Sequence, residues 1–166
     1  MSMFSRSALA AALLAVAPFA SAATATDAFT VSITIENSCS VTVGDLAFPT
    51  SNSLATAIDA STTGAVTCTG IGAYTVSFND GVGVGATTGA RKMTGPAGAT
   101  IDYTLATGSA TGPLLGDDAG AASFTGTSVG NDIADAPFTI YGRVAGGQNP
   151  KPIGAYADTV TATVSF

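Results

Sequence analysis

The stretch GAYADTVTATVSF, residues 154–166, ends the sequence with a regular alternation of side chains. One face carries Tyr156, Asp158, Val160, Ala162, Val164 and Phe166, and the other carries only Ala, Thr and Ser. A period of two predicts a β-strand that buries one face. An apolar edge strand invites aggregation unless another element covers it. Because no residues follow Phe166, we expect this strand to need a partner from elsewhere.

A second alternating segment, FTVSITIE at residues 29–36, lies near the other end of the sequence. Its apolar residues are Phe29, Val31, Ile33 and Ile35. This segment could be the first strand of the chain's own sandwich or a strand that enters a neighbouring molecule, and the pattern fits both equally well. Alternation shows that one face is buried but not in which molecule's core. Fully extended, residues 23–37 would span roughly 50 Å.

Short alternating runs separated by turn signals fill the middle of the sequence. We predict strands at residues 39–43, 65–69, 73–78, 101–105 and 138–144, followed by a last strand over residues 156–166. Gly, Pro and Asn-Asp-Gly clusters lie between them, and residues 51–63 are expected to form a long connection with room for one helical turn. This arrangement predicts an all-β sandwich or barrel.

The composition excludes several classes of function. Of 166 residues, 46% are hydrophobic and 10% are charged, the formal net charge is −6, and histidine is absent. Without histidine the chain has neither Ser-His-Asp nor Cys-His catalysis and no imidazole metal site. Its five cations form no basic stripe, so we expect no nucleic acid partner. Catalysis would have to depend on carboxylates alone, and we expect no enzyme.

Two segments imitate ligand-binding motifs. GVGVGA at residues 81–86 has the spacing of a dinucleotide fingerprint, but Thr87–Ala90 is a poor helix former, so we expect a hairpin loop. Asp117 and Asp118, with Asp132 and Asp135, lack the ordered spacing of a calcium loop. We therefore expect neither a cofactor nor a metal ion.

The first residues predict export. Residues 1–22 combine Arg6, an apolar stretch over residues 8–17 and the small-x-small sequence of residues 20–22, which is typical of a cleaved secretory signal peptide. The apolar stretch is too short to cross a bilayer, and no later run is long enough, so no transmembrane segment is expected after cleavage. In an oxidising compartment Cys39 and Cys68 most often form one structural disulfide; two free thiols or half of a metal site are the alternatives.

The sequence resembles the spore coat protein U domain family, to which the Csu-type pilins of archaic chaperone-usher pili belong. The resemblance covers nearly all of residues 24–166. It is carried by the alternating arm before Cys39, by the strand AVTCT around Cys68, by RKM at residues 91–93, by IDY at residues 101–103, by FTIYGRV at residues 138–144, and most specifically by the GAYADTV sequence and terminal Phe of residues 154–166.

The resemblance implies an incomplete immunoglobulin-like β-sandwich that a donor strand from a neighbouring subunit completes. The implied organisation is a signal peptide at residues 1–22, a donor-strand arm at residues 23–37 and a pilin domain at residues 38–166. Phe29, Val31, Ile33 and Ile35 would be the inserting residues. The acceptor groove, which an assembly chaperone would also contact, would contain Tyr156, Val160, Val164 and Phe166.

The resemblance also implies a function. The chain would be a structural pilin subunit that polymerises by donor-strand complementation into a surface pilus supporting adhesion and biofilm formation. Its partners would be neighbouring pilin subunits, a periplasmic chaperone and an outer-membrane usher, and it would pass through the periplasm to an extracellular fibre. The alternatives are a secreted spore-coat or surface structural protein that no usher assembles, and a minor or tip adhesive subunit.

Overall fold

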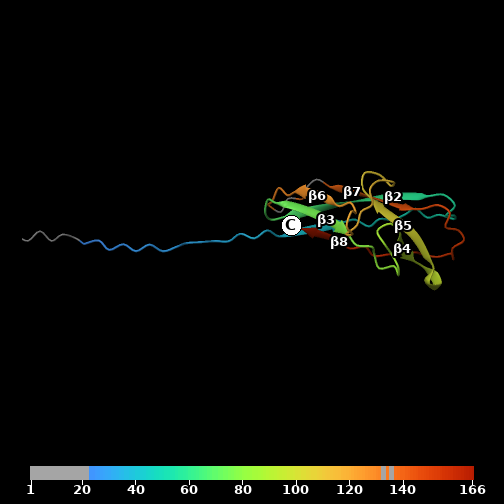
Figure 1. Cartoon of the computed structure of the whole chain (residues 1–166), viewed down its shortest axis with the longest axis horizontal. Coiled ribbons are helices and arrows are strands. Elements are labelled where there is room, and N and C mark those ends of the chain that lie inside the picture. The colour runs from blue at the N-terminus through green and yellow to red at the C-terminus, as the bar shows by residue number, and fades with distance from the viewer. Residues whose placement is uncertain (1–22, 132–133, 135–136) are drawn as a thin grey trace, which may run out of the picture. The chain divides into compact units, whose positions relative to one another are not determined.

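The computed structural model describes residues 23–131, 134 and 137–166 (Figure 1). The predicted signal peptide lies outside the described residues. The chain divides into two units, Met1–Thr34 and Ile35–Phe166. Every named strand lies in the second unit, which is called the body below. In the first unit, residues 23–34 form no strand or helix.

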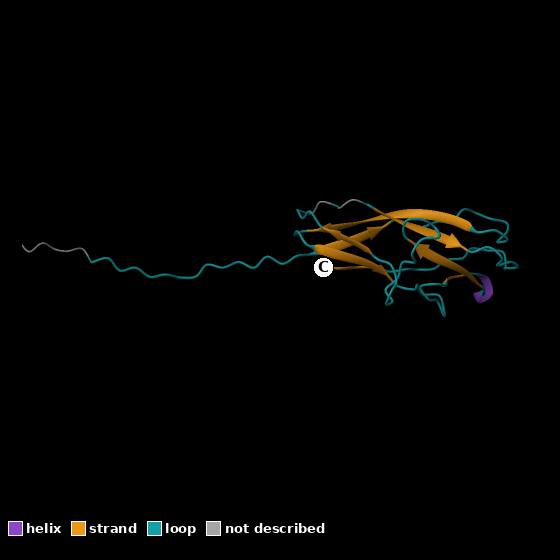
Figure 2. Cartoon of the chain, turned by 45° about the horizontal axis from the view of Figure 1, so that its top comes forward, coloured by secondary structure: helices purple, strands orange, loops and turns teal. Residues whose placement is uncertain are grey.

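The body is an all-β sandwich of two antiparallel sheets (Figure 2). The strands are β1 (Cys39–Val43), β2 (Ile58–Cys68), β3 (Ala73–Phe78), β4 (Arg91–Thr94), β5 (Thr100–Ala106), β6 (Phe124–Thr127), β7 (Phe138–Val144) and β8 (Ala162–Ser165). One sheet has the order β1-β2-β7-β5-β4, and the other has the order β6-β3-β8. The turn η1 (Pro96–Gly98) connects β4 to β5. This immunoglobulin-like arrangement confirms the predicted fold class.

The core lies between the two sheets because each strand alternates apolar and polar side chains. In β3, Tyr74, Val76 and Phe78 are buried, while the residues between them are more exposed. Val66 of β2 and Ile140 of β7 meet them from the other sheet within one apolar cluster. The period of two read from the sequence therefore places the core correctly.

The predicted disulfide between Cys39 and Cys68 is confirmed. The two residues face each other in the register of β1 and β2, with their Cα atoms 4.1 Å apart. The bond closes a loop over a sequence separation of 29 residues and joins the start of β1 to the end of β2.

The predicted connection over residues 51–63 needs correction. The predicted long connection over residues 51–63 ends at Ala57, because Ile58–Thr63 forms the first half of β2 and pairs with β7. This half is built mostly of small and polar residues, so it carries little hydrophobic signal; it becomes a strand through its ladder with β7 and the ion pair Arg143–Asp59. No helical turn forms in residues 51–63.

The predicted last strand is also too long. Only Ala162–Ser165 forms β8, which pairs with β3, and upstream Ala157 makes a single bridge to Thr94 of β4. The segment therefore leaves the edge of one sheet at Ala157 and joins the other sheet at Ala162, and it pairs with neither sheet in between. The prediction also omitted β4 and β6, whose four-residue sequences RKMT and FTGT are too short to give a clear pattern.

The loop after β3 has the conformation of a turn, as predicted. Gly81 and Gly85 have φ angles of 88° and 73°, which favour glycine, and Thr87 forms a bridge with Ala90. No helix follows this loop, so it lacks the helix N-terminus that a dinucleotide would require. Within residues 23–131, 134 and 137–166, no helix has the length and apolar character needed to cross a membrane.

Candidate functional site

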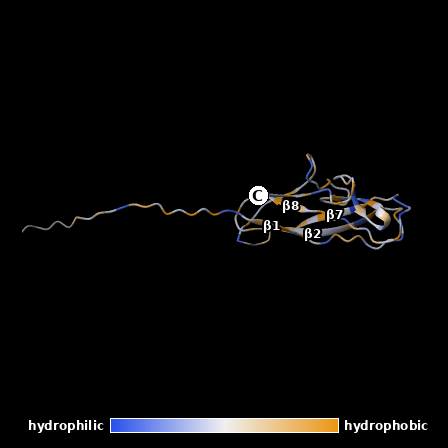
Figure 3. Cartoon of the chain, turned by 90° about the horizontal axis from the view of Figure 1, so that it is seen from below, coloured by the Kyte–Doolittle hydropathy of each residue, from blue (hydrophilic) through white to orange (hydrophobic). Residues whose placement is uncertain are grey.

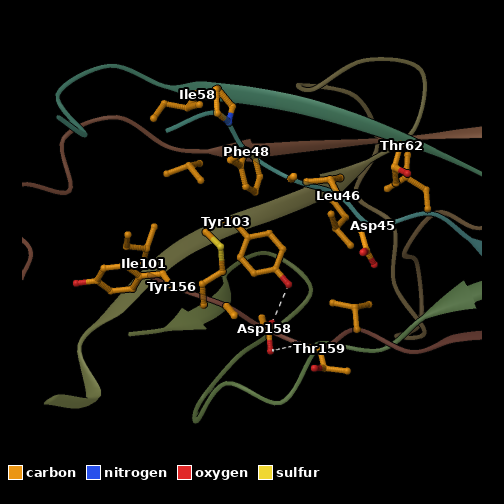
Figure 4. A pocket seen from close by; sticks show the side chains of 18 of the residues that line it. Asp45, Leu46, Phe48, Ile58, Thr62, Ile101, Tyr103, Tyr156, Asp158 and Thr159 are labelled. Carbon is orange, nitrogen blue, oxygen red and sulfur yellow. Dashed lines mark hydrogen bonds between the residues drawn. The ribbon is translucent and has the colours of Figure 1, made fainter. Parts of the chain in front are cut away.

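An apolar groove of about 980 Å³ opens into the sandwich (Figure 4). One wall is formed by β1 and the segment that follows it, residues 41–51, and the other wall by residues 154–162 before and at the start of β8. The floor is formed by core side chains of β5 and β7, namely Ile101, Tyr103, Leu105, Ile140 and Val144. The groove thus reaches the hydrophobic core directly.

The groove exists because both sheets end at this side of the body. β1 is an edge strand of the larger sheet, and β8 is an edge strand of the smaller one. The two strands contact each other, but they share no ladder (Figure 3). Unpaired strand edges present rows of N–H and C=O groups that readily add another strand. The groove is therefore bordered by backbone that can accept a further strand.

The clearest unpaired position lies at Val160. Its side chain lines the groove, and its backbone makes no hydrogen bond to the residues that the structure describes. By contrast, the neighbouring Thr161 bonds through its backbone N and O to Asn79. A backbone group without a partner is costly once water is excluded from it, so Val160 would gain from an added strand.

Leu46 and Phe48 form the upper wall of the groove. Phe48 packs edge-to-face on Tyr103, with ring centroids 6.4 Å apart and planes at 70°. Both side chains reach the sheet because β7 has a glycine at residue 142: a Cβ there would lie 2.8 Å from Leu46 Cδ2 and 2.9 Å from Phe48 Cζ. Gly142 thus permits the close approach that shapes this wall.

Two carboxylates, those of Asp45 and Asp158, line the mostly apolar groove, and hydrogen bonds hold that of Asp158. Its Oδ2 accepts a hydrogen bond from the Tyr103 hydroxyl at 2.7 Å, and its Oδ1 accepts from the backbone N of Val82 at 2.9 Å and of Thr159 at 2.8 Å. Burial raises the pKa of Tyr103 well above its ordinary value, and Asp158 raises it further. Asp158 therefore connects the segment before β8 to β5 in the opposite sheet and to the loop after β3.

A buried arginine supports the loops beside the groove. Arg91 is fully buried, and its guanidinium donates to the carbonyl oxygens of Phe78, Asn79, Thr88 and Leu115. Burial lowers the pKa of Arg91, while nearby tyrosine and aspartate side chains oppose that shift. Since its donors meet backbone acceptors and its side chain is inaccessible, Arg91 is a structural residue.

The described residues contain no group of three His, Cys, Asp or Glu side chains close enough to hold a metal ion. The groove itself presents mostly apolar side chains, the carboxylates of Asp45 and Asp158, a few Ser and Thr side chains and unpaired backbone. Such a surface is suited to binding an extended apolar segment, because a strand adds backbone hydrogen bonds and inserts alternate side chains.

The structure places the residues proposed for the acceptor groove in two groups. Tyr156 and Val160 line the groove. Val164 packs against the core from β8, and Phe166 is 59% exposed; neither is among the groove-lining residues. The sequence analysis did not select Leu46 and Phe48. Their spacing of two could have suggested a strand-like wall, but the pattern changes phase after Val43, at Gly44.

The residues proposed for the donor strand are all exposed. The side chains of Phe29, Val31, Ile33 and Ile35 have exposures between 82% and 86%. These residues form no strand within the chain. Four large apolar side chains at alternate positions would be unfavourable in water if nothing covered them.

Three comparisons with known proteins bear on this site. The model of the Spore Coat Protein U domain family matches residues 25–163. No curated protein sequence matches the chain. Among solved structures, the chain is similar to a chain of the crystal structure of the CsuC-CsuE chaperone–tip adhesion subunit pre-assembly complex from archaic chaperone-usher Csu pili of Acinetobacter baumannii, with a TM-score of 0.51 and 18% identity. The match covers 80% of this chain and 41% of the other, so it spans about two fifths of that chain and supports a shared fold.

Proposed function

The chain belongs to the Spore Coat Protein U domain family, and we propose that it is a structural subunit of a chaperone-usher surface pilus that polymerises by donor-strand complementation. In this proposal the groove of one subunit accepts residues 29–35 of the next subunit. Each contact is head-to-tail and does not close on itself, so repeated contacts form a filament.

The observation that carries the proposal is the match between the groove and the exposed arm. The wall from Gly154 to Ala162 has the length of an extended segment of nine residues, and Phe29–Ile35 is an extended segment of seven. The groove is apolar and reaches the core, and the arm carries apolar side chains at every second position. The body of one subunit lacks the element that the arm of another can supply.

The apolar side chains of the arm would supply a large favourable term to such a contact. Burying four side chains of this size contributes roughly 6–12 kcal/mol before the cost of ordering the arm. The added strand would also bond to the free backbone of Val160. Phe29, Val31, Ile33 and Ile35 would enter the groove, while Thr30, Ser32 and Thr34 would face solvent.

The proposal implies partners during assembly. Before polymerisation the groove would expose the core to water, so a periplasmic chaperone would cover it with a strand of its own, and an outer-membrane usher would exchange that strand for the arm of the next subunit. The similar solved structure is a complex of a pilus subunit with its chaperone, which supports this route. The fibre would be extracellular and would serve adhesion and biofilm formation.

A pair of substitutions in the arm tests the proposal. Ile33→Asp introduces a charge on the inserting face, and Ser32→Asp introduces the same charge on the solvent face. We expect cells producing the Ile33→Asp chain to show no fibres by negative-stain electron microscopy and no heat-labile, detergent-resistant ladders on gels. The Ser32→Asp chain should polymerise normally. Ladders that persist in Ile33→Asp would refute the assignment of the donor strand.

A further inference from the structure

The arm begins at a fixed point on the body. The side chain of Asn37 accepts a hydrogen bond from the backbone N of Gly70 at 2.8 Å. The backbone N of Ser38 donates to Thr69 Oγ1 at 3.0 Å, and its carbonyl accepts from the backbone N of Thr69 at 2.9 Å. Cys39 is then held by the disulfide. Glu36, immediately before these residues, therefore lies at a defined place beside the end of the body that carries the arm.

This end of the body also contains the end of β8. Ser165 pairs with Thr75 near the start of β3, a few residues after the Thr69–Gly72 loop that holds Asn37. The groove begins at Ala162, the first residue of β8, and runs away from this end toward residues 154–156. Its far end is therefore opposite to Asn37, the residue at which the chain enters the body.

Lys151 lies near that far end. The hydroxyl of Tyr156, which lines the groove, donates a hydrogen bond to the carbonyl of Pro152 at 2.8 Å. Pro152, the residue after Lys151, therefore lies beside the groove. Tyr156 also packs against Gly95, and Gly154 against Pro96, so this corner is built from two loops in contact. Lys151 itself is half-buried and is not a groove-lining residue, but its backbone adjoins Pro152, which the hydrogen bond from Tyr156 holds at the end of the groove.

Lys151 differs from the other cations in the described part of the chain. Lys92 pairs with Asp102 at 2.8 Å, Arg143 pairs with Asp59 at 2.7 Å, and Arg91 is buried among carbonyl oxygens. Lys151 makes no ion pair or hydrogen bond to a described residue. Glu36 is exposed and likewise has no such partner. The body thus carries a free acid at one end and a free cation at the other.

The direction of an inserted strand decides whether these charges meet. A strand antiparallel to residues 156–165 places Ile35 near Tyr156 and its parent body beyond the far end of the groove. A parallel strand would place that parent body beside the acceptor's own arm, where the two would compete for space. The antiparallel direction also matches every ladder between named strands in the body.

We propose that Glu36 of each donor subunit forms an ion pair with Lys151 of its acceptor, and that this contact helps to set the direction of the arm in the groove. The proposal rests on the proposed function, since it requires the arm to occupy the groove. Glu36 follows Ile35 and projects from the opposite face, so it stays outside the groove while Ile35 enters it. In a chain with eleven acids and five cations, this contact would offset part of the repulsion between subunits.

A charge-exchange cycle with a synthetic arm tests the contact. The acceptor is the mature chain with Ile33→Asp in its own arm, either with Lys151 or with Lys151→Glu. The donor is a fluorescent amidated peptide of residues 23–38 that carries Glu36 or Glu36→Lys. At low salt we expect each single reversal, Lys151→Glu in the acceptor or Glu36→Lys in the peptide, to weaken binding or slow association about 2- to 5-fold. Combining the two reversals should restore the original affinity and association rate. The differences should vanish at about 0.5 M salt.

An Asp27→Lys peptide is the matched control, because Asp27 lies at the other end of the arm. Because this peptide retains Glu36, Lys151→Glu should weaken its binding by the same factor as it weakens binding of the unmodified peptide, so that Asp27→Lys shows no coupling to residue 151. If Asp27→Lys couples to residue 151 and Glu36→Lys does not, the strand runs parallel and the proposal is wrong. If the unmodified peptide binds but no combination shows coupling, the ion pair is refuted while the proposed function stands. If the unmodified peptide does not bind at all, the proposed function fails, and the ion pair fails with it.

Discussion

The hydroxyl of Tyr103 donates a hydrogen bond to the carboxylate of Asp158 with 2.7 Å between the oxygens, and this bond joins β5 to the segment that crosses between the sheets. The segment has no ladder at this point, so a side chain holds it in place of backbone pairing. Asp158 is thus a structural residue within the groove, and the shape of one groove wall depends on it.

Replacing Tyr103 should show the strength of this bond. We expect Tyr103→Phe to lower the free energy of unfolding by about 1.5–3 kcal/mol, because the variant removes a hydrogen bond to a charged acceptor. Urea denaturation of the full chain would measure this change in the free energy of unfolding. Tyr141→Phe is the control, since the hydroxyl of Tyr141 makes no hydrogen bond within the described residues, and it should change stability by less than about 0.5 kcal/mol. Equal effects of the two variants would contradict the assigned role.

The raised pKa of Tyr103 predicts a loss of stability at alkaline pH. In the unfolded chain the tyrosine ionises near its ordinary pKa of 10.0, whereas in the folded chain burial keeps it neutral to higher pH. Its contribution is fully present below pH 10 and falls as the pH rises above 10, because the unfolded state loses the proton first. Unfolding free energies measured between about pH 9 and pH 11.5 should therefore decline more steeply for the wild type than for Tyr103→Phe. If the unfolding free energies of the two proteins fall in parallel with pH, ionisation of Tyr103 does not cause the alkaline loss of stability.

Gly142 should control the shape of the groove wall. A Cβ at residue 142 would crowd Leu46 and Phe48, so Gly142→Ala should displace them and weaken binding of the arm peptide about 10-fold or more, an overpacking cost of at least about 1.4 kcal/mol. Fluorescence anisotropy with the labelled peptide would measure the change. Gly89→Ala is the control, because a Cβ there meets no atom within 4 Å. Unchanged affinity in Gly142→Ala would show that the wall tolerates the methyl group.

Arg91 should be essential to the stability of the loops beside the groove. Arg91→Met would leave up to four carbonyl oxygens without their donor, and we expect it to cost about 2–4 kcal/mol in unfolding free energy. Lys151→Met, which removes an unpaired cation, should cost less than about 0.5 kcal/mol. Chemical denaturation of both variants would compare them. A small effect of Arg91→Met would mean that water satisfies the carbonyl groups.

The disulfide should stabilise the base of the arm. The paired substitution of Cys39 and Cys68 by Ser should lower the unfolding free energy by about 3–4 kcal/mol, because the open loop regains conformational entropy in the unfolded chain. Denaturation with and without reductant would test this: the wild type should lose stability on reduction, and the double variant should not respond. A lower rupture force in fibres of Cys39→Ser would show that the bond also resists pulling; an unchanged force would exclude that role.

Strong alternation made parts of the fold predictable. Residues 39–43, 73–78 and 138–144 were predicted as strands with the bounds that the structure gives them. The first half of β2 was missed because its small polar residues become a strand only through pairing with β7. Within the site, Tyr156 and Val160 belong to an alternating segment, whereas Leu46 and Phe48 follow a change of phase at Gly44 that hides their common wall.

By itself, the sequence determined the local features: the period of two, the turns, the family resemblance and the cysteine pair. These depend on neighbouring residues or on composition. Only the tertiary structure decided that β1 and β8 are edge strands that leave a groove between them, and that Ala157 and Ala162 belong to different sheets. Strand order and crossing points depend on contacts between distant residues, which alternation does not encode. The apolar face of residues 156–166 predicted that a covering partner is needed, and the packing of the two sheets leaves a groove, lined by Tyr156 and Val160, in which we propose that this partner binds.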